Sequence, residues 1–379
     1  MLDVDYALVG GGLQNGLIAL ALGAQRPGTR IALIERGSSV GGNHTWCFHA
    51  ADVPERAAAW IDPLIIARWQ GYDVAFPALT RSLATPYACV SSQRLHERVV
   101  AELGASVHLS TIAEHVDAHE VVVRDARGRR ETICARVVID ARGPDHATPL
   151  ACGWQKFLGR ELQLAARHDV QQPLLMDATV PQRDGFRFMY VLPLAADRLL
   201  VEDTYFSDGS SFDVAASRVE IERYAAAKGW RLASVAREET GILPMPWKLA
   251  PPAVRAPLVA GYAGGWFHPV TGYSFPIAAR LAALVAAQPA DALFGPELAA
   301  FAAEHARQLA FAQRLTHMLF HWFSPAQRHN VLARFYRLPE PAICRFYALQ
   351  LTALDRARMF AGRPPRGMSW RAVFGLEAR

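Results

Sequence analysis

The chain has 379 residues and a mass of 41.6 kDa, of which 51% are hydrophobic and 20% charged. This composition excludes a disordered chain and allows two or three structural units. The uncharged apolar runs are shorter than the roughly 20 residues of a membrane-spanning helix, and the acidic start MLDVDYALVGGG argues against a secretory signal. Five scattered cysteines without a C-x-x-C pair indicate a reduced cytoplasmic protein rather than a disulfide framework or cysteine-rich metal site.

The net charge of +5 is unevenly distributed along the chain. Residues 296–379 contain 12 arginines, no lysine, five acids and 12 aromatic residues. Such a segment suits nucleic acid, an anionic membrane or a solvated helical face. Because no recognised nucleic-acid-binding fold is visible, we expect no nucleic-acid partner.

The N-terminus predicts a strand, a glycine turn, a helix and a second strand. Residues 4–9 form the first apolar run, residues 15–25 have helical character, and residues 30–35 end in Glu35. This order is typical of a dinucleotide-binding βαβ unit. Gly10 and Gly12 would let the backbone approach a pyrophosphate at the helix N-terminus, and Glu35 would hold a ribose diol.

The glycine pattern departs from the usual one at its third position. Asn15 occupies that position, and Gly16 comes one residue late. We therefore expect the helix to lie slightly displaced from its usual packing against the strand.

The remaining pattern predicts a nucleotide domain that is interrupted by a substrate domain. Strand-like runs within 105–140, 186–205 and 257–260 are interspersed with helices expected over 91–103, 213–228 and about 275–287, and the chain is helical in pattern from about 297. The expected units are a dinucleotide domain over 1–152 and 250–295, a β-rich substrate domain over 153–249 and a helical region over 296–379.

Six segments resemble the bacterial lycopene β-cyclases, which are FAD-binding flavoproteins. These segments are VGGGLQNGLIAL (9–20), GGNHTWCFH (41–49), VIDARG (138–143), YVLPLAADRLLVEDTYFSD (190–208), ETGILPMPW (239–247) and GWFHPVTGYSFPIAARLA (265–282). The resemblance implies an α/β fold with a glutathione-reductase-like (Rossmann-type) FAD domain, an antiparallel β-rich substrate domain and a helical C-terminal region.

The resemblance also implies an activity, the conversion of lycopene to β-carotene through γ-carotene. That isomerisation involves no net redox change, yet family members require reduced FAD, with NAD(P)H as the reductant. The alternatives are a flavin-dependent reductase or hydroxylase of a hydrophobic isoprenoid, and a non-enzymatic carotenoid-binding or flavin-storage protein. Only the redox enzymes would consume one nicotinamide per turnover.

Cofactor contacts are expected from the glycine turn, the GGNHTW loop and the HPVTGYS segment. This class of flavoprotein usually has a Gly-Asp pair before its last helix, where this chain has Gly261-Tyr262, so the contact to the ribityl chain is in question. The expected FAD-binding residues are Gly10, Gly12, Leu13, Glu35, Arg36, Gly41, Gly42, Asn43, His44, Arg94, Asp140, Gly143, Gly264, Gly265, His268, Pro269, Thr271 and Gly272.

Glu202 and Asp203 are the candidate catalytic acids. Cyclisation requires a proton donor to an alkene, which a carboxylic acid kept protonated by burial can provide. Neighbours on a strand point to opposite faces, so only one of the two should meet the substrate. The similar FLEET motif of the plant cyclases aligns its first acid with Glu202, which favours Glu202 as the group that donates or later removes a proton and Asp203 as its support. In the alternative interpretation both acids make structural bonds at a strand edge.

Aromatic residues in these segments could stabilise a carbocation through their ring faces, or simply form the core. They are Trp46, Phe48, Tyr190, Phe206, Trp247, Trp266, Phe267 and Tyr273. An anionic reduced flavin would add preorganised negative charge, which gives a redox cofactor a part in a non-redox reaction.

The basic, aromatic tail suggests how a bilayer-dissolved substrate is reached. Arginine and aromatic residues on amphipathic helices suit a membrane surface, so we expect a cytoplasmic protein peripherally associated with the inner membrane. A helical cap on the other domains is the alternative. His317 and His321 have metal-binding spacing but lack a third ligand, so no metal is predicted. The sequence does not predict the oligomeric state.

Overall fold

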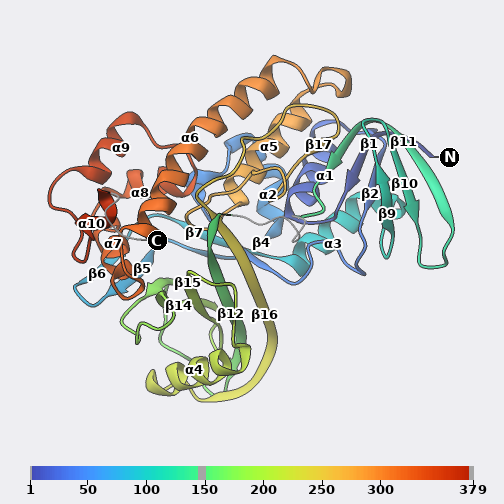
Figure 1. The fold of residues 1–379 in the computed structure, drawn as a ribbon. Helices are drawn as coiled ribbons and strands as arrows, with labels where there is room; N and C mark the ends of the chain where they lie inside the picture. The colour runs from blue at the N-terminus through green and yellow to red at the C-terminus, as the bar shows by residue number, and fades with distance from the viewer. Residues whose placement is uncertain (1, 144–150, 375–379) are drawn as a thin grey trace.

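The fold was analysed in a computed structural model that describes residues 2–143 and 151–374. Figure 1 shows the N-terminal sheet at one end, the C-terminal helices at the other, and a long antiparallel sheet with α4 below them. The helices are α1 (Leu13–Gln25), α2 (Ala58–Ile61), α3 (Ser92–Leu103), α4 (Val214–Ala227), α5 (Phe275–Ala287), α6 (Pro296–His321), α7 (Arg328–Phe335), α8 (Glu340–Tyr347), α9 (Ala353–Phe360) and α10 (Trp370–Val373).

The first sheet is built around the predicted βαβ unit. Its order is β8-β2-β1-β11-β10-β9, and β17 pairs with the end of β11. The long β11 pairs antiparallel with β10 along its first half and parallel with β1 and β17 further on. The strands are β1 (Leu2–Val9), β2 (Ile31–Ile34), β8 (Val107–His108), β9 (Ile112–Val116), β10 (Glu120–Arg124), β11 (Arg130–Asp140) and β17 (Leu258–Val259).

Asn15 explains how α1 packs without the usual third glycine. Its side chain is fully buried, and its amide donates to the backbone carbonyls of Val9 at 3.0 Å and Gly10 at 2.9 Å. The amide therefore ties the helix to the end of β1. Gly16 instead faces Leu95 of α3, where an added Cβ would lie 3.1 Å from the leucine side chain.

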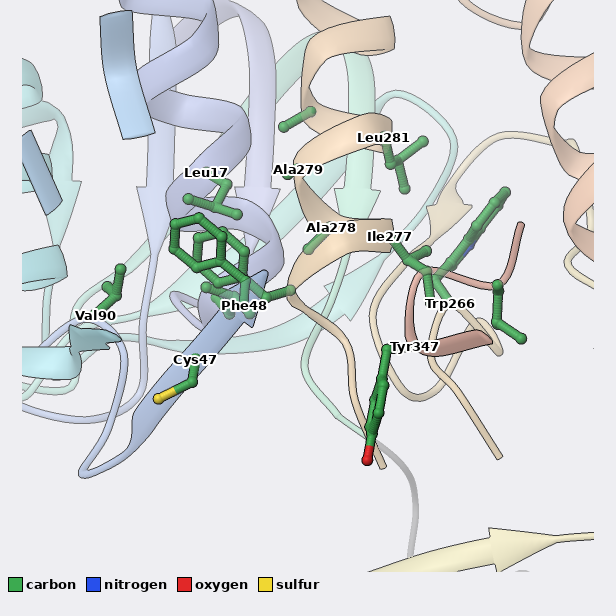
Figure 2. Packing of buried hydrophobic residues seen from close by; sticks show 14 of the residues in the cluster. Leu17, Cys47, Phe48, Val90, Trp266, Ile277, Ala278, Ala279, Leu281 and Tyr347 are labelled. Atoms are coloured by element: carbon green, nitrogen blue, oxygen red, sulfur yellow. The ribbon is translucent and has the colours of Figure 1, made fainter. Parts of the chain in front are cut away.

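The core beneath this sheet joins distant segments of the chain. Figure 2 shows Leu17 of α1 next to Phe48, with Ala278 and Ala279 of α5 close by. Small residues on α5 let it pack closely on α1, so this later part of the chain contacts the N-terminal unit.

The second sheet is larger than the predicted 153–249 unit. Its order is β16-β12-β15-β14-β13-β5-β6, and every pair is antiparallel except β13 with β5. Strands β5 and β6 come from a part of the chain whose pattern carried little signal. The strands are β5 (Tyr72–Phe76), β6 (Leu79–Leu83), β12 (Cys152–Leu164), β13 (Leu174–Asp177), β14 (Phe186–Ala195), β15 (Arg198–Ser207) and β16 (Leu232–Pro246).

A small third sheet connects the two larger units. Strand β7 (Tyr87–Ser91) lies between β3 (Thr45–His49) and β4 (Ile65–Trp69), and both of its neighbours run antiparallel to it. Strand β3 carries the second half of the GGNHTWCFH motif. The motif therefore leads from the N-terminal unit towards the second sheet.

Residues 296–374 form the predicted helical region. No helix within the described part of the chain is long and apolar enough to cross a membrane. The rings of His317 and His321 stack at 4.2 Å between centroids, and both meet Trp247 edge-on. In residues 2–143 and 151–374 no group of three or more His, Cys, Asp or Glu side chains could hold a metal ion.

Candidate active site

A cavity of about 590 Å³ runs from the glycine turn of the first sheet to one face of the second sheet. Its walls come from four parts of the chain: the βαβ unit, β3, the β14–β15 hairpin with β12 and β16, and the start of α5. Tyr347 of α8 adds a contribution from the C-terminal region. The site therefore forms only when segments more than 300 residues apart in sequence meet.

The end of the cavity at the βαβ unit is a cradle for an extended phosphate group. Gly10 has a φ of +89°, and a Cβ there would lie 2.7 Å from the carbonyl oxygen of Ala141. Among the described residues no atom lies within 4 Å of a Cβ built on Gly12, so the N-terminus of α1 is open to the cavity. Glu35 Oε2 accepts the backbone N–H of Gly11 at 2.7 Å, which fixes the carboxylate at the cavity wall.

Tyr262 occupies the position where an aspartate was expected in this class. Its hydroxyl donates to the carbonyl of Gly272, and its ring stacks on Phe267 at 4.1 Å. Tyr262 also lines the cavity, but it offers no carboxylate for a ribityl chain. Buried acceptor oxygens of Gln14 and Gln155, which lack hydrogen-bond partners within the described residues, line the cavity as well.

Most of the predicted site residues lie around this cavity. The residues that line it are Gly10, Gly12, Leu13, Glu35, Arg36, Gly41, Gly42, His44, Gly143, Glu202, Thr271 and Gly272. Eight others do not: Asn43, Arg94, Asp140, Asp203, Gly264, Gly265, His268 and Pro269.

The residues outside the cavity have other partners. The Asn43 amide donates to the Glu238 carbonyl at 2.8 Å, and Asp140 pairs with Arg142 at 2.7 Å. Arg94 lies on α3 with its guanidinium 3.4 Å from Glu97. In this structure these three side chains have partners within the protein and do not line the cavity.

The first residues of the HPVTGYS segment (268–274) are packed in the core, and only the later ones line the cavity. His268 is fully buried, accepts the Val270 N–H at 3.1 Å and packs against Phe346, with Pro269 buried beside it. The glycines before it serve a turn, since a Cβ on Gly264 would lie 2.1 Å from the Val259 carbonyl and Gly265 has a φ of +75°. Only the second half of the segment, from Thr271, reaches the cavity.

Glu202 and Asp203 point to opposite faces of β15, as the strand alternation predicted. Asp203 is fully buried on the face covered by α4, where Arg187 donates to it at 2.7 Å and the Tyr205 hydroxyl at 2.8 Å. Burial nonetheless raises the pKa of Asp203. Glu202 lines the cavity on the other face. One acid therefore belongs to the cavity and the other to a buried ion pair.

Glu202 lies in a row of four residues across the second sheet. Tyr190 of β14, Glu202, Gly159 of β12 and Glu239 of β16 are in direct cross-strand register, so their side-chain positions share one face. Gly159 leaves the space between the two glutamates open, and a Cβ there would lie 3.1 Å from Glu239 Cγ. Glu239 thus leans over the glycine towards Glu202.

Burial in this cavity, reinforced by the negative charge of Glu239, raises the pKa of Glu202 to about 8. The Thr204 hydroxyl donates to Glu202 Oε1 at 2.5 Å and opposes that shift. Glu239 itself accepts Arg237 at 2.7 Å and Thr45 at 3.2 Å. The raised pKa favours the protonated form of Glu202, whose carboxyl lies in a mostly aromatic and aliphatic wall.

Several cavity residues escaped the sequence analysis. His49, Tyr87, Gln155, Phe157 and Tyr347 line the cavity without having been predicted. The alternation of TWCFH along β3 could have placed His49 on the same side as Cys47. No pattern could have placed Tyr347, because only the packing of α8 brings it to the site. Of the predicted aromatic residues Trp46, Tyr190, Phe206, Trp266 and Tyr273 line the cavity, whereas Phe48, Trp247 and Phe267 do not.

The fold is the α/β architecture that solved flavoproteins share. The rebeccamycin biosynthetic enzyme RebC, solved with reduced flavin, superposes with a TM-score of 0.61 at 17% identity, over 95% of this chain and 76% of that one. The family described as lycopene cyclase protein matches residues 5–372.

Two relatives narrow the class to one family. A lycopene beta-cyclase of Pseudescherichia vulneris is 42% identical over 381 residues, covering 97% of both chains. A lycopene beta-cyclase of Pantoea ananas is 40% identical over 371 residues, covering 95% of both. The chain belongs to the lycopene cyclase family.

Proposed function

We propose that this protein is a lycopene β-cyclase, which converts lycopene to β-carotene through γ-carotene with no net redox change. The observation that carries the proposal is the placement of Glu202, whose carboxyl faces an apolar cavity that continues to a dinucleotide cradle and whose pKa is raised by burial there. An alkene has no basic heteroatom, so only a strong or desolvated acid in direct contact can protonate it.

The cradle fits FAD in its geometry and its donors. The open N-terminus of α1 and the positive-φ Gly10 suit the pyrophosphate, and Glu35 suits the adenosine ribose. The start of α5, with Thr271 and Gly272, suits the flavin end. Reduced FAD bound there would supply negative charge beside a carbocation, and NAD(P)H would serve only to keep the flavin reduced.

In the proposed mechanism Glu202 donates its proton to the terminal double bond of one end of the polyene. The electron pair of a nearby double bond then closes the six-membered ring and leaves a tertiary cation. The ring faces of Trp46, Tyr190 and Phe206 line the same cavity and stabilise that cation, each by about 0.5–2 kcal/mol. Loss of a ring proton gives the β-ring, and the second end repeats the sequence.

Product analysis tests the proposal. Purified protein is incubated anaerobically with lycopene in liposomes, FAD and either dithionite or a nicotinamide. We expect β-carotene with dithionite alone, with many turnovers per flavin. A product that gains hydrogen or oxygen in step with the reductant consumed would instead indicate a redox flavoenzyme.

We further propose that residues 354–374 contact the inner membrane, from which lycopene would enter. Within residues 2–143 and 151–374, four of the eight exposed large hydrophobic residues lie in this segment, namely Leu354, Phe360, Trp370 and Phe374. Arginines 356, 358, 363, 366 and 371 are interspersed with them. Exposed apolar side chains flanked by arginines suit an anionic bilayer surface.

Flotation with liposomes tests this contact. We expect binding to anionic vesicles that weakens with salt and falls when Phe360→Ser and Trp370→Ser are combined. Val219→Ser is the matched control, because Val219 is as exposed but lies on α4. Equal binding by both variants would contradict the assignment of this surface.

A further inference from the structure

His49 ends β3 and faces the cavity, although neither the cofactor cradle nor the acid uses it. At the end of β3, Cys47 and His49 line the cavity while Phe48 between them turns to the core; Thr45 and Trp46 at the start of the strand line the cavity as well. Figure 2 shows this alternation, with the Phe48 ring beside Leu17 and the Cys47 sulfur directed away from it. The His49 side chain is only 1% exposed.

The hydrogen bonds of His49 define which ring nitrogen is free. Nδ1 lies 3.2 Å from Asp52 Oδ2, and that oxygen also accepts the His49 backbone N–H at 2.9 Å and the Tyr273 hydroxyl at 3.2 Å. Two lone pairs at this distance would repel, so Nδ1 carries the proton and donates it to the carboxylate. Nε2 then presents a lone pair, and it has no hydrogen-bond partner within the described residues.

The surroundings of His49 are aromatic. The rings of Tyr72, Tyr87, Tyr273 and Tyr347 lie between 5.1 and 6.3 Å from its ring, centroid to centroid. Four tyrosine rings therefore surround the imidazole.

Tyrosines also connect His49 to Glu202 across the cavity. The Tyr87 hydroxyl lies 3.3 Å from that of Tyr190, and Tyr190 is the cross-strand neighbour of Glu202. His49 and Glu202 therefore face one cavity from different strands, with the Tyr87–Tyr190 pair between them.

We propose that His49 Nε2 is the base that removes the ring proton, oriented by Asp52; this inference rests on the proposed cyclase function. Glu202 gives one proton to the terminal alkene, and the C–C bond forms from the second alkene. His49 takes one proton from a carbon beside the cation, whose C–H electron pair becomes the ring double bond. The imidazolium is then paired with Asp52, and exchange with solvent restores both groups.

There is a chemical reason for the base to be a different residue from the acid Glu202. The carboxylate left on Glu202 lies nearest to the carbon it has just protonated, so proton return from that carbon only reverses the reaction. The ring cation has hydrogens on three neighbouring carbons, and loss from each gives a different position of the double bond. A lone pair fixed at one point of the cavity selects one of the three.

The test uses His49→Gln and Asp52→Asn in the full-length protein reconstituted with FAD. An amide at position 52 donates to Nδ1 and moves the ring proton to Nε2, which removes the base without removing the ring. We expect β-ring formation to fall at least about 100-fold in both variants. In D₂O, lycopene recovered from the variants should contain deuterium at its ends, because protonation still occurs and reverses, and residual cyclic product should contain other ring isomers.

Controls separate this role from a structural one. Asp177→Asn is matched to Asp52→Asn, because Asp177 is also a buried carboxylate that accepts a tyrosine hydroxyl, from Tyr224 at 2.8 Å, but lies outside the cavity. The Asp177→Asn variant should form β-rings at the wild-type rate and no other ring isomers. Flavin absorbance and melting temperature establish folding of each variant, and Asp52→Asn carries the test if His49→Gln does not fold.

The experiment distinguishes failure of the His49 proposal from failure of the proposed cyclase function. Wild-type protein that forms no β-carotene contradicts the proposed function itself. Wild-type β-carotene formation together with an unchanged rate and only β-rings in Asp52→Asn and His49→Gln overturns the base. Loss of rate without deuterium in recovered lycopene or altered ring isomers also overturns it.

Discussion

The two faces of β15 place adjacent acids in opposite environments. Asp203 lies beneath α4 and is neutralised by Arg187, with both side chains fully buried. Glu202 faces a cavity, accepts one hydrogen bond from the Thr204 hydroxyl and lies near a second carboxylate, Glu239. Glu202 and Asp203 are therefore adjacent in the sequence, but their side chains lie on opposite faces of the sheet. A guanidinium pairs directly with Asp203 and makes it structural, whereas burial and the nearby Glu239 favour the protonated form of Glu202.

The largest expected effect comes from Glu202→Gln. Because the proposed proton donor is removed, product formation should fall by about 10²–10⁴-fold, measured by product analysis at saturating lycopene. Flavin absorbance and thermal stability should remain close to wild type, since a neutral amide replaces a neutral acid. Retained cyclisation would contradict the assignment of Glu202.

Asp203→Asn should affect stability instead. It leaves Arg187 buried with only Glu220 as an acidic partner, at 3.1 Å, and should cost about 3 kcal/mol in the free energy of unfolding. Denaturant unfolding measures this as a lower midpoint with an unchanged slope. Turnover per folded molecule should persist at reduced temperature. If Asp203→Asn abolished turnover while remaining stable, the roles of the two acids would be exchanged.

The pH dependence should follow the protonated form of Glu202. Activity present below the pKa of about 8 should be lost as the pH rises through it. Glu239→Gln removes a nearby negative charge, lowers the pKa of Glu202 and should move this alkaline limb about one unit towards acid. Among the other groups, Asp203 on the opposite face of β15 also raises the pKa of Glu202, Arg237 pairs with Glu239 at 2.7 Å, and the cross-strand neighbour Tyr190 is neutral.

Glu238→Gln is the matched control for this shift. Glu238 precedes Glu239 on β16 but does not line the cavity, and it pairs with Arg218 at 2.5 Å and Arg160 at 3.2 Å. The alkaline limb of the pH–activity profile of Glu238→Gln should coincide with that of wild type. If the alkaline limb of Glu239→Gln also coincided with that of wild type, the charge of Glu239 would have no effect on the pKa of Glu202.

Thr204→Val should give the smallest effect, with the opposite sign. The lost hydroxyl stabilises the ionised form of Glu202, so its removal raises the pKa of Glu202 further. The alkaline limb should move towards higher pH by a fraction of a unit, resolved by rate measurements at closely spaced pH values. A shift towards acid would mean that the hydroxyl serves the neutral form instead.

The N-terminal cradle and the opposite faces of β15 could be predicted because both depend on local order. Glycines followed by a helix and an acid after the next strand are contiguous, and strand alternation alone separates neighbours such as Glu202 and Asp203. The helix over Phe275–Ala287 was confirmed for the same reason, since its apolar pattern is continuous. The strands between residues 65 and 83 were missed because their runs are short and mixed. Strands β5 and β6 pair with each other locally, and only the parallel pairing of β5 with β13 joins them to the second sheet.

The sequence by itself determined the fold class, the family and which segments carry the chemistry. Tertiary structure alone decided that Gly159 places Glu239 beside Glu202, that Arg187 neutralises Asp203, and that His268 packs in the core while His49 faces the cavity. Each of these placements depends on the register between strands or on contacts with segments that are far away in the sequence. Charge and burial act through space, so the chemistry of a carboxyl or an imidazole follows from its neighbours there rather than from its neighbours in the chain.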